Sequence, residues 1–316
     1  MFVDYMTQPT RNNTGLMVNN RVQTMWMQSN TITTGGTQAN PRIIENVTFT
    51  DRVVVQAPYI TFRNCLFTGA MATFNTGLLD TTHVNCVGIR AEYCDFNHTN
   101  LTFHTNCVLG HDTIVYRCWL NRGVDGVGGY NTAGGNANIQ LLCSYVNELA
   151  WWSMDNDHTD GTHNDGVQIQ SGGNVTIRGN TFYGYKYNAN LLGLPIIDSG
   201  ANNRYPQVGN IVLIQKNAAA GNVTPTNINI SDNWIYGGDH GIVLRTGTIA
   251  VVENNKWMDN GQRNYGGSLL YYYIRITSDV TLNGQTYAAQ SAAYTQPAAN
   301  NKVFAGTDAT IRVDAA

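Results

Sequence analysis

A short strand-like motif recurs along this chain, and its spacing restricts the fold more than any other feature. Apolar and polar residues alternate up to a small Cys or Asn, and bulky residues follow, as in Ile60–Phe67 and Ile89–Phe96. The small residue is found at Cys65, Cys94, Cys118, Cys143, Asn180, Asn233 and Asn255. Alternation predicts β-strands, and a repeated step predicts stacked units that bury one shared core.

A second motif, His-x-Asn/Asp-Cys/Gly-Val, repeats between copies of the first. It occurs at His83–Val87, His104–Val108 and His163–Val167, and Gly123–Val127 and Gly238–Ile242 keep its last part. Two strand types per step of about 22–25 residues, joined by Gly/Asn turns, predict an all-β, single-stranded parallel β-helix. Equivalent residues of neighbouring coils then stack as ladders.

The ladders also explain the cysteines. One ladder holds Cys65, Cys94, Cys118 and Cys143 with the asparagines of the first motif, and a second holds Cys86 and Cys107 with Gly126 and Gly166. Small interior residues of this kind are expected as buried free thiols. Neighbouring rungs lie about 4.8 Å apart, which leaves a disulfide as the alternative.

Composition narrows the function. Charged residues are 12% of the chain, about half the usual ~25%, and the net charge is −3. Without a basic stripe, nucleic-acid binding is not expected. The longest apolar runs are too short to cross a membrane, and the first residues lack the pattern of a secretory signal. We expect a cap or attachment segment over residues 1–40, the β-helix over 41–283 and a C-terminal cap or tail over 284–316.

Two insertions, residues 147–162 and 183–208, interrupt the regular coils after the first strand type. Insertions at one position of successive coils emerge on the same side, so we expect them to flank one groove, where function usually resides. Glycosidic cleavage needs two carboxyl groups, and elimination from a uronic acid needs a base and a cation. The candidates for catalysis are Asp155, Asp157, His158, Asp160, His163 and Asp165.

Each candidate has a second interpretation. The spacing of Asp155, Asp157 and Asp160 fails the EF-hand pattern, so an irregular calcium site and simple turn capping both remain open. No cofactor is required by the sequence. His163 has counterparts at His83 and His104 in plain coils, which favours packing or turn formation. The candidates for substrate binding are Trp151, Trp152, Tyr185, Lys186, Tyr187, Arg204 and Tyr205, and the alternative is that their rings pack the insertions onto the coils.

The segments Val53–Cys65, Asp160–Gln170 and Asn233–Gly238 resemble the pectate-lyase-like superfamily of right-handed parallel β-helix proteins, above all versions in actinobacteria and in minor tail proteins of their phages. The resemblance covers about residues 40–260. It implies a tail adsorption protein that binds a host-surface polysaccharide between the two insertions, without nucleic acid or membrane insertion.

The superfamily also leaves alternatives. The chain lacks the acid motifs of polygalacturonases and the calcium and arginine pattern of pectate lyases, yet a polysaccharide lyase or glycoside hydrolase in the same groove stays open. A structural tail subunit is the third alternative. The resemblance implies other tail proteins as partners and a homotrimer as one assembly. It places the protein in the virion, in a tail that acts outside the host cell, and secretion is the alternative.

Overall fold

The described part of the chain consists almost entirely of short strands. The computed structural model describes residues 7–18, 23–70, 76–98, 105–131, 133–152, 162–184, 187–188, 210–238, 240–245, 247–258, 273–277, 279–288, 293–303 and 308–314. Within these ranges the only helices are 3-10 helices: η1 (Arg11–Asn13), η2 (Gly15–Val18) and η3 (Ala218–Ala220). No helix among the described residues is long and apolar enough to span a membrane.

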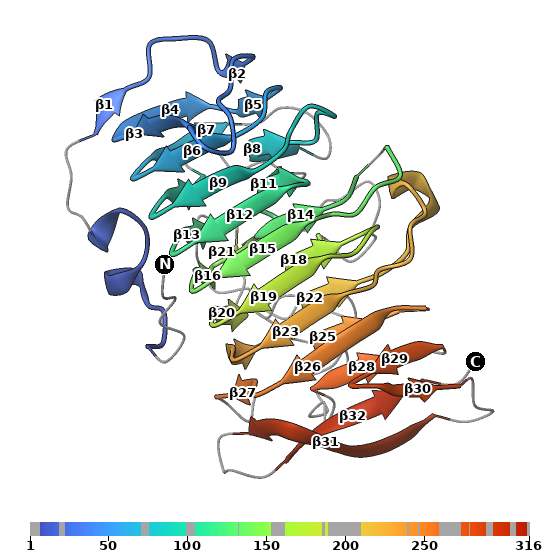
Figure 1. Cartoon of the computed structure of the whole chain (residues 1–316). Helices are drawn as coiled ribbons and strands as arrows, with labels where there is room; N and C mark the ends of the chain where they lie inside the picture. Colours follow the sequence, from blue (N-terminus) through green and yellow to red (C-terminus); the bar gives the residue numbers. More distant parts are fainter. Residues whose placement is uncertain are drawn as a thin grey trace.

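Strands that recur once per coil stack into three sheets, and sheet 1 crosses the centre of Figure 1. Its strands are β3 (Arg42–Glu45), β6 (Ile60–Arg63), β9 (Ile89–Glu92), β12 (Thr113–Tyr116), β15 (Ile139–Leu142), β19 (Val175–Arg178), β23 (Ile228–Ser231), β26 (Ile249–Glu253), β29 (Val280–Leu282) and β30 (Gln285–Tyr287). Every pairing is parallel except the final β29–β30 hairpin.

Sheets 2 and 3 complete each coil. Sheet 2 contains β1 (Thr24–Met25), β4 (Val47–Asp51), β7 (Leu66–Ala70), β10 (Asp95–Asn97), β13 (Trp119–Asn121), β16 (Tyr145–Asn147), β20 (Thr181–Gly184), β24 (Trp234–Gly237), β27 (Lys256–Trp257) and β31 (Tyr294–Val303). Sheet 3 contains β2 (Thr31–Ile32), β5 (Val53–Val55), β8 (Thr76–Thr81), β11 (Thr105–Gly110), β14 (Val127–Gly129), β18 (Asp165–Ile169), β22 (Asn210–Ile214), β25 (His240–Leu244), β28 (Ile274–Ile276) and β32 (Asp308–Val313). The predicted parallel β-helix is confirmed.

The turn from sheet 1 into sheet 2 has one left-handed residue in each coil. These residues are Asn46, Asn64, Tyr93, Arg117, Cys143, Gly179, Asp232 and Asn254, all with φ between 50° and 67°, and Asn300 has the same conformation at an irregularity within β31. A left-handed residue turns the chain sharply between two strands, and Asn and Gly adopt it at least cost. This repeated turn sets the position of the residue that follows it.

The following residue forms a buried hydrogen-bonded ladder. The backbone N–H of each rung donates to the side chain of the rung on the next coil: Cys118 to Ser144, Ser144 to Asn180, Asn180 to Asn233, Asn233 to Asn255 and Asn255 to Asn301. The ladder predicted through Cys65, Cys94 and Cys118 and the asparagines is confirmed, but the assignment of Cys143 was wrong. Cys143 occupies the left-handed position, and the adjacent Ser144 supplies the rung.

The second predicted ladder needs a similar correction. Cys107 is level with Gly126 and Gly166 in sheet 3, as expected. Cys86 is not, because Leu79 pairs with Val108, which makes Leu78 the equivalent residue. Cys86 instead lies in the turn after β8, with its Sγ 3.0 Å from the Val55 carbonyl oxygen. His83 is therefore not a counterpart of His163. All six cysteines are free and buried.

One continuous apolar core fills the coils from Ile32 to Val313. Inward residues of sheet 2 stack on one another: the rings of Phe49 and Phe67 are 4.9 Å apart, and those of Phe67 and Phe96 are 4.6 Å apart. Because no coil could bury these side chains alone, the core forms between coils rather than within them.

Residues outside the regular coils contact the sides and the end of the solenoid. The segment with η1 and η2 lies beside sheet 2, at the left of Figure 1, and β1 and β2 pair with β4 and β5. At the other end β31 pairs antiparallel with β32, while its last residues pair in parallel with β27. The strands β30, β31 and β32 thus cover this end of the stack.

Candidate functional site

Both insertions begin at the corner between sheets 2 and 3, on adjacent coils. Their first residues pair as the short parallel strands β17 (Ala150–Trp151) and β21 (Tyr187–Asn188). The chain returns at Asp165 and Asn210, which are direct partners in β18 and β22. The described ends of the two insertions therefore lie side by side.

Most of the predicted site residues lie outside the described residues. These are Asp155, Asp157, His158, Asp160, Tyr185, Lys186, Arg204 and Tyr205, and the side chain of Tyr187 joins them. The suggested calcium ligands belong to this group. Among the described residues, no group of three or more His, Cys, Asp or Glu side chains is arranged to hold a metal ion.

The base of the first insertion is closed by hydrogen bonds. The Trp152 N–H donates to Thr162 Oγ1 over 3.1 Å, and the Thr162 N–H donates to the Trp152 carbonyl over 3.0 Å. Asn164 is fully buried and donates to the carbonyls of Val124 and Ala150, both at 2.7 Å. Trp151 is only 5% exposed, so its ring offers little surface to a ligand, and Trp152 is half-buried.

Asp165 forms a carboxyl pair with Asp125 of the preceding coil. Asp125 is 8% exposed and Asp165 is 1% exposed. Asp125 Oδ1 accepts the Asp165 N–H at 2.8 Å, and Asp165 Oδ1 accepts the N–H and the Nδ2 of Asn210 at 2.9 and 2.7 Å. Gln168 Nε2 donates to the other carboxylate oxygen of Asp165 over 3.1 Å.

Burial disfavours the ionised form of both carboxyl groups. It raises the pKa of Asp165 from 3.8 to about 6, against the lowering effect of the hydrogen bonds from Asn210. The pKa of Asp125 is raised well above its usual value by burial and by the charge of Asp165. Two buried carboxyl groups on adjacent coils, both with raised pKa values, are candidates for general acid and base chemistry.

His163 lies next to this pair but differs from it in exposure. Its side chain is exposed, and the sheet register places Gly123, not another histidine, at the same level of the preceding coil. The suggested counterpart His104 lies outside the described residues. The repeat in plain coils at His83 and His104 was the argument for a purely structural role of His163. Because His83 is not a counterpart of His163, it does not support that role.

The outer face of sheet 2 carries an aromatic patch on four successive coils. We define it as Trp119, Tyr145, Tyr183, Trp234 and Tyr236. Trp119 pairs with Tyr145, Thr181 pairs with Trp234, and Tyr183 pairs with Tyr236, whose ring is 5.9 Å away. Tyr183 is 40% exposed, Trp119, Tyr145 and Tyr236 are half-buried, and Trp234 is buried at 8% exposure, so the first four offer the ligand-accessible surface.

Amide and carboxylate groups border the patch. Asn147 Oδ1 accepts hydrogen bonds from Trp119 Nε1 at 2.6 Å and from Asn121 Nδ2 at 3.2 Å. Asn121 Nδ2 also donates to Glu148 Oε2 over 3.4 Å. Because Asn147 and Tyr183 are the first residues of the two insertions, the patch lies where the insertions begin.

The N-terminal segment occupies part of this face. Gln8 Nε2 donates to the Tyr236 hydroxyl over 3.0 Å, and the Arg11 guanidinium lies 3.9 Å from the centre of the Trp119 ring. Arg11 also pairs with the buried Asp95 at 2.8 Å. The segment therefore crosses the aromatic patch and is fixed at one side of it.

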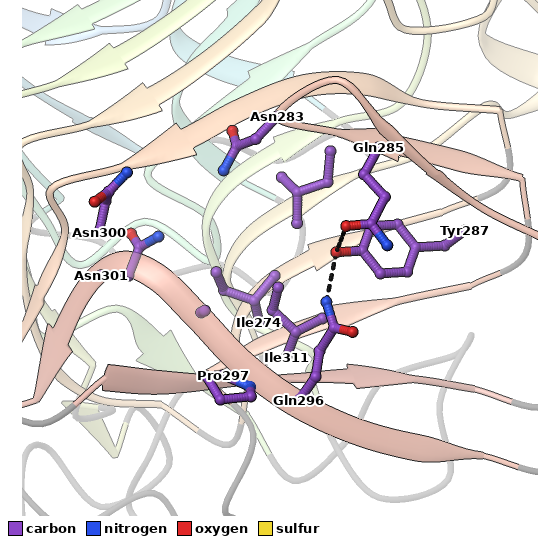
Figure 2. Close-up of a pocket in the computed structure, with 11 residues that line it drawn as sticks. Ile274, Asn283, Gln285, Tyr287, Gln296, Pro297, Asn300, Asn301 and Ile311 are labelled. Atoms are coloured by element: carbon purple, nitrogen blue, oxygen red, sulfur yellow. Dashed lines mark hydrogen bonds between the residues drawn. The ribbon is translucent and has the colours of Figure 1, made fainter.

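A separate pocket of about 230 Å³ opens at the C-terminal end, away from the insertions (Figure 2). Ile274, Leu282 and Ile311 belong to its apolar lining, and amide side chains surround them. Gln296 Nε2 donates to the Tyr287 hydroxyl at 2.7 Å, which in turn donates to Gln285 Oε1 at 3.4 Å. No lining residue is charged, and the pocket is the partly open end of the core.

Sequence analysis missed Asp125 and the aromatic patch. The signal for Asp125 was present, since Gly123–Val127 already aligned with His163–Val167. The patch was visible as the bulky residue directly after three rungs, namely Trp119, Tyr145 and Trp234. Searches against protein-family models, curated proteins and solved structures found no match to this chain.

Proposed function

We propose that this chain binds a polysaccharide on the outer face of sheet 2, at the foot of the two insertions. The observation that carries the proposal is the aromatic patch, which repeats over four adjacent coils and remains partly exposed. A polysaccharide is itself a linear repeat, so a surface that repeats along a rigid axis can contact several of its sugars in turn.

The chemistry of the patch suits sugars. An aromatic ring covers the apolar C–H face of a pyranose, and its polar edge remains available to hydroxyl groups. Asn147 and the tyrosine hydroxyls supply the donors and acceptors that such hydroxyls need. Strands fix these groups more precisely than loops would, which lowers the ordering cost of binding.

The biological setting that we propose follows the resemblance of the sequence. In it the chain is a phage tail adsorption protein, its ligand is a host-surface polysaccharide, and its protein partners are other tail subunits, with a homotrimer as one assembly.

Binding to purified host cell-wall polysaccharide tests the proposal. We expect Tyr183→Ala and Trp119→Ala each to raise the Kd about tenfold, equivalent to ~1.4 kcal/mol. The matched control is Tyr93→Ala, because Tyr93 is a partly buried aromatic residue at a different corner, where it packs on Tyr116. Equal Kd values for all three variants and the parent would reject the patch as the binding surface.

A second function, acid-catalysed glycoside cleavage, is favoured by one specific observation. Asp125 and Asp165 lie on adjacent coils, their pKa values are raised, and the first insertion ends beside them. In this role one carboxyl protonates the glycosidic oxygen, and the other acts as nucleophile or activates water. Both side chains are buried, so this role requires a rearrangement that exposes them to the substrate.

Reducing-end release distinguishes cleavage from binding. An enzyme would release reducing ends from the bound polysaccharide, and Asp125→Asn or Asp165→Asn would lower the rate at least a hundredfold. Absorbance from unsaturated uronates would indicate elimination instead. If the polysaccharide is bound without either product, the carboxyl pair has a structural role.

A further inference from the structure

Three arginines lie on the outer face of sheet 3 in its last three coils. Arg275 and Arg312 are direct partners in β28 and β32, and Arg275 pairs with Val243 of β25. Arg245 immediately follows β25. The neighbouring inward residues, Ile274 and Ile311, are buried in the core, so the sheet holds the arginines on its other side.

The described residues place one carboxylate directly on this cluster. Asp314 accepts a hydrogen bond from Arg275 Nε at 2.6 Å and from Arg312 Nε at 2.7 Å. Arg275 Nη1 lies 3.1 Å from His240 Nε2. The Arg245 guanidinium makes no hydrogen bond or ion pair to the described residues, and its side chain is exposed.

His240 behaves as a neutral member of the cluster. Burial and the positive charges of Arg275, Arg312 and Arg245 together lower the pKa of His240 to about 4, against the opposing effect of the Asp314 carboxylate. At neutral pH its Nε2 accepts from Arg275 and adds no charge. Like-charged arginines on adjacent strands repel one another, so a cluster with one shared carboxylate has capacity for a further anion.

The cluster adjoins the proposed polysaccharide site. Tyr236 is the next-to-last residue of β24, which ends at Gly237, and His240 begins β25 two residues further along the chain after Gly238. A polymer on the aromatic patch therefore reaches the arginines by crossing one corner of the same coil. Guanidinium groups are the preferred ligands of carboxylate and phosphate oxygens, because they donate in parallel pairs.

We propose that Arg245 and Arg275, with Arg312 and Asp314 as positioning residues, bind an oxyanion group of an acidic polysaccharide. This inference rests on the proposed function and names its substrate class. The shared chemistry is a carboxylate or phosphate oxygen pair, supplied either by a uronic acid or by a phosphodiester-linked polymer. Asp314 keeps two guanidinium groups in place, and Arg245 contributes a further positive charge that forms no ion pair with the described residues.

Affinity measurements on the full chain with three defined polymers test this inference. The probes are polygalacturonate, poly(glycerol phosphate) and neutral dextran of similar length. We expect an anionic polymer to bind at least tenfold more tightly than dextran, and Arg245→Gln to remove most of that difference. The matched control is Arg178→Gln, because Arg178 is an exposed arginine on sheet 1, where it pairs with Asp232 at 2.7 Å.

The two anionic probes identify the source of the oxyanion, and tighter binding of either one supports the inference. Equal affinities for all three polymers, or an anionic preference that Arg245→Gln leaves unchanged, would overturn it. Tyr183→Ala separates the two proposals: loss of dextran binding in that variant, with no anionic preference in the parent, retains the aromatic site and removes the arginine site.

A small-anion probe covers the remaining case, in which no polymer binds. Sodium glucuronate is titrated against glucose, with saturation-transfer NMR as the readout. Glucuronate contacts that Arg245→Gln abolishes would support the arginine site although the polysaccharide proposal had failed. The absence of such contacts in the parent protein would overturn both.

Discussion

At the scale of single residues, this fold depends on polar side chains in its interior. Asn180, Asn233 and Asn255 are fully buried, and each both donates to and accepts from a neighbouring coil. A buried amide with all its partners is tolerated, whereas one missing partner costs the full desolvation of the groups left behind. The ladder therefore specifies the register of the coils.

Asn233→Ala tests this dependence. The change removes the acceptor of the Asn180 N–H, one of the two acceptors of Asn180 Nδ2, and the side-chain donor to the Ile177 carbonyl. We expect the free energy of unfolding to fall by about 3 kcal/mol, since each unsatisfied buried group costs ~1–3 kcal/mol. Asn227→Gly is the control: Asn227 also donates to an asparagine of the preceding coil, but at an exposed left-handed position. Equal losses in urea unfolding would contradict the argument.

Asp165→Asn tests the raised pKa of the buried carboxyl. Because the folded state holds its proton up to about pH 6, Asp165 favours folding below pH 3.8 and loses this contribution as the pH rises through 6. A pKa change from 3.8 to about 6 corresponds to about 3 kcal/mol, at ~1.36 kcal/mol per pKa unit.

The measurement is thermal unfolding of both proteins from pH 4 to 8. Relative to Asp165→Asn, the parent should lose stability as the pH rises from 4 to 7. His98 and His240 titrate in the opposite sense, because burial lowers the pKa values of both, but their contribution is common to the two proteins and cancels in the difference. A constant difference across the range would show that Asp165 ionises normally.

The residue-level errors of the sequence analysis have a physical cause. Cys143 and Ser144 are both small, so composition alone does not decide which one faces the interior. The left-handed turn decides which of the two residues faces the interior, and a pattern of small residues does not predict backbone angles. The prediction for His83 was wrong for a similar reason. The five-residue match His83–Val87 resembled a strand, but these residues form a turn.

At the scale of elements, the regular coils were predictable and the N-terminal segment was not. The periodicity of the sequence predicts the repeated strands, and the longer steps between rungs predict the position of the two insertions. Nothing in the polar residues around η1 and η2 indicates that they lie against sheet 2. Their position is fixed by tertiary contacts. Arg11 and the Leu16 N–H donate to Asp95, and the Gly15 N–H donates to the Arg117 carbonyl.

Arg11→Ala should release this segment. Burial already raises the pKa of Asp95, and loss of Arg11 removes its ion pair and leaves the Leu16 N–H as its remaining described partner. We expect a loss of about 2 kcal/mol in unfolding free energy, with faster proteolysis before residue 23. Arg63→Ala is the control, because its partner Glu92 keeps Arg90 at 2.7 Å. Equal proteolysis of the two variants would show that Arg11 does not hold the segment.

At the scale of the whole molecule, a solenoid must end its stack without exposing strand edges. Here the end is covered by the β29–β30 hairpin and by β31, which runs antiparallel to β32. Ala298, Ile311 and Val313 from these strands extend the apolar core by a last layer. An uncovered parallel edge would pair with another chain, so this arrangement protects the protein from edge-to-edge association.

Removal of residues 284–316 tests the role of this end. The truncated chain would expose the edges of β27 and β28 together with Ile274 and Leu282, which are now buried. We expect larger assemblies than the full chain forms, measured by light scattering after size-exclusion chromatography. Ile311→Ser separates the two causes: it disturbs the core layer by about 2–4 kcal/mol but leaves both edges covered. If Ile311→Ser assembles as readily as the truncation, exposure of the core rather than of the edges drives association.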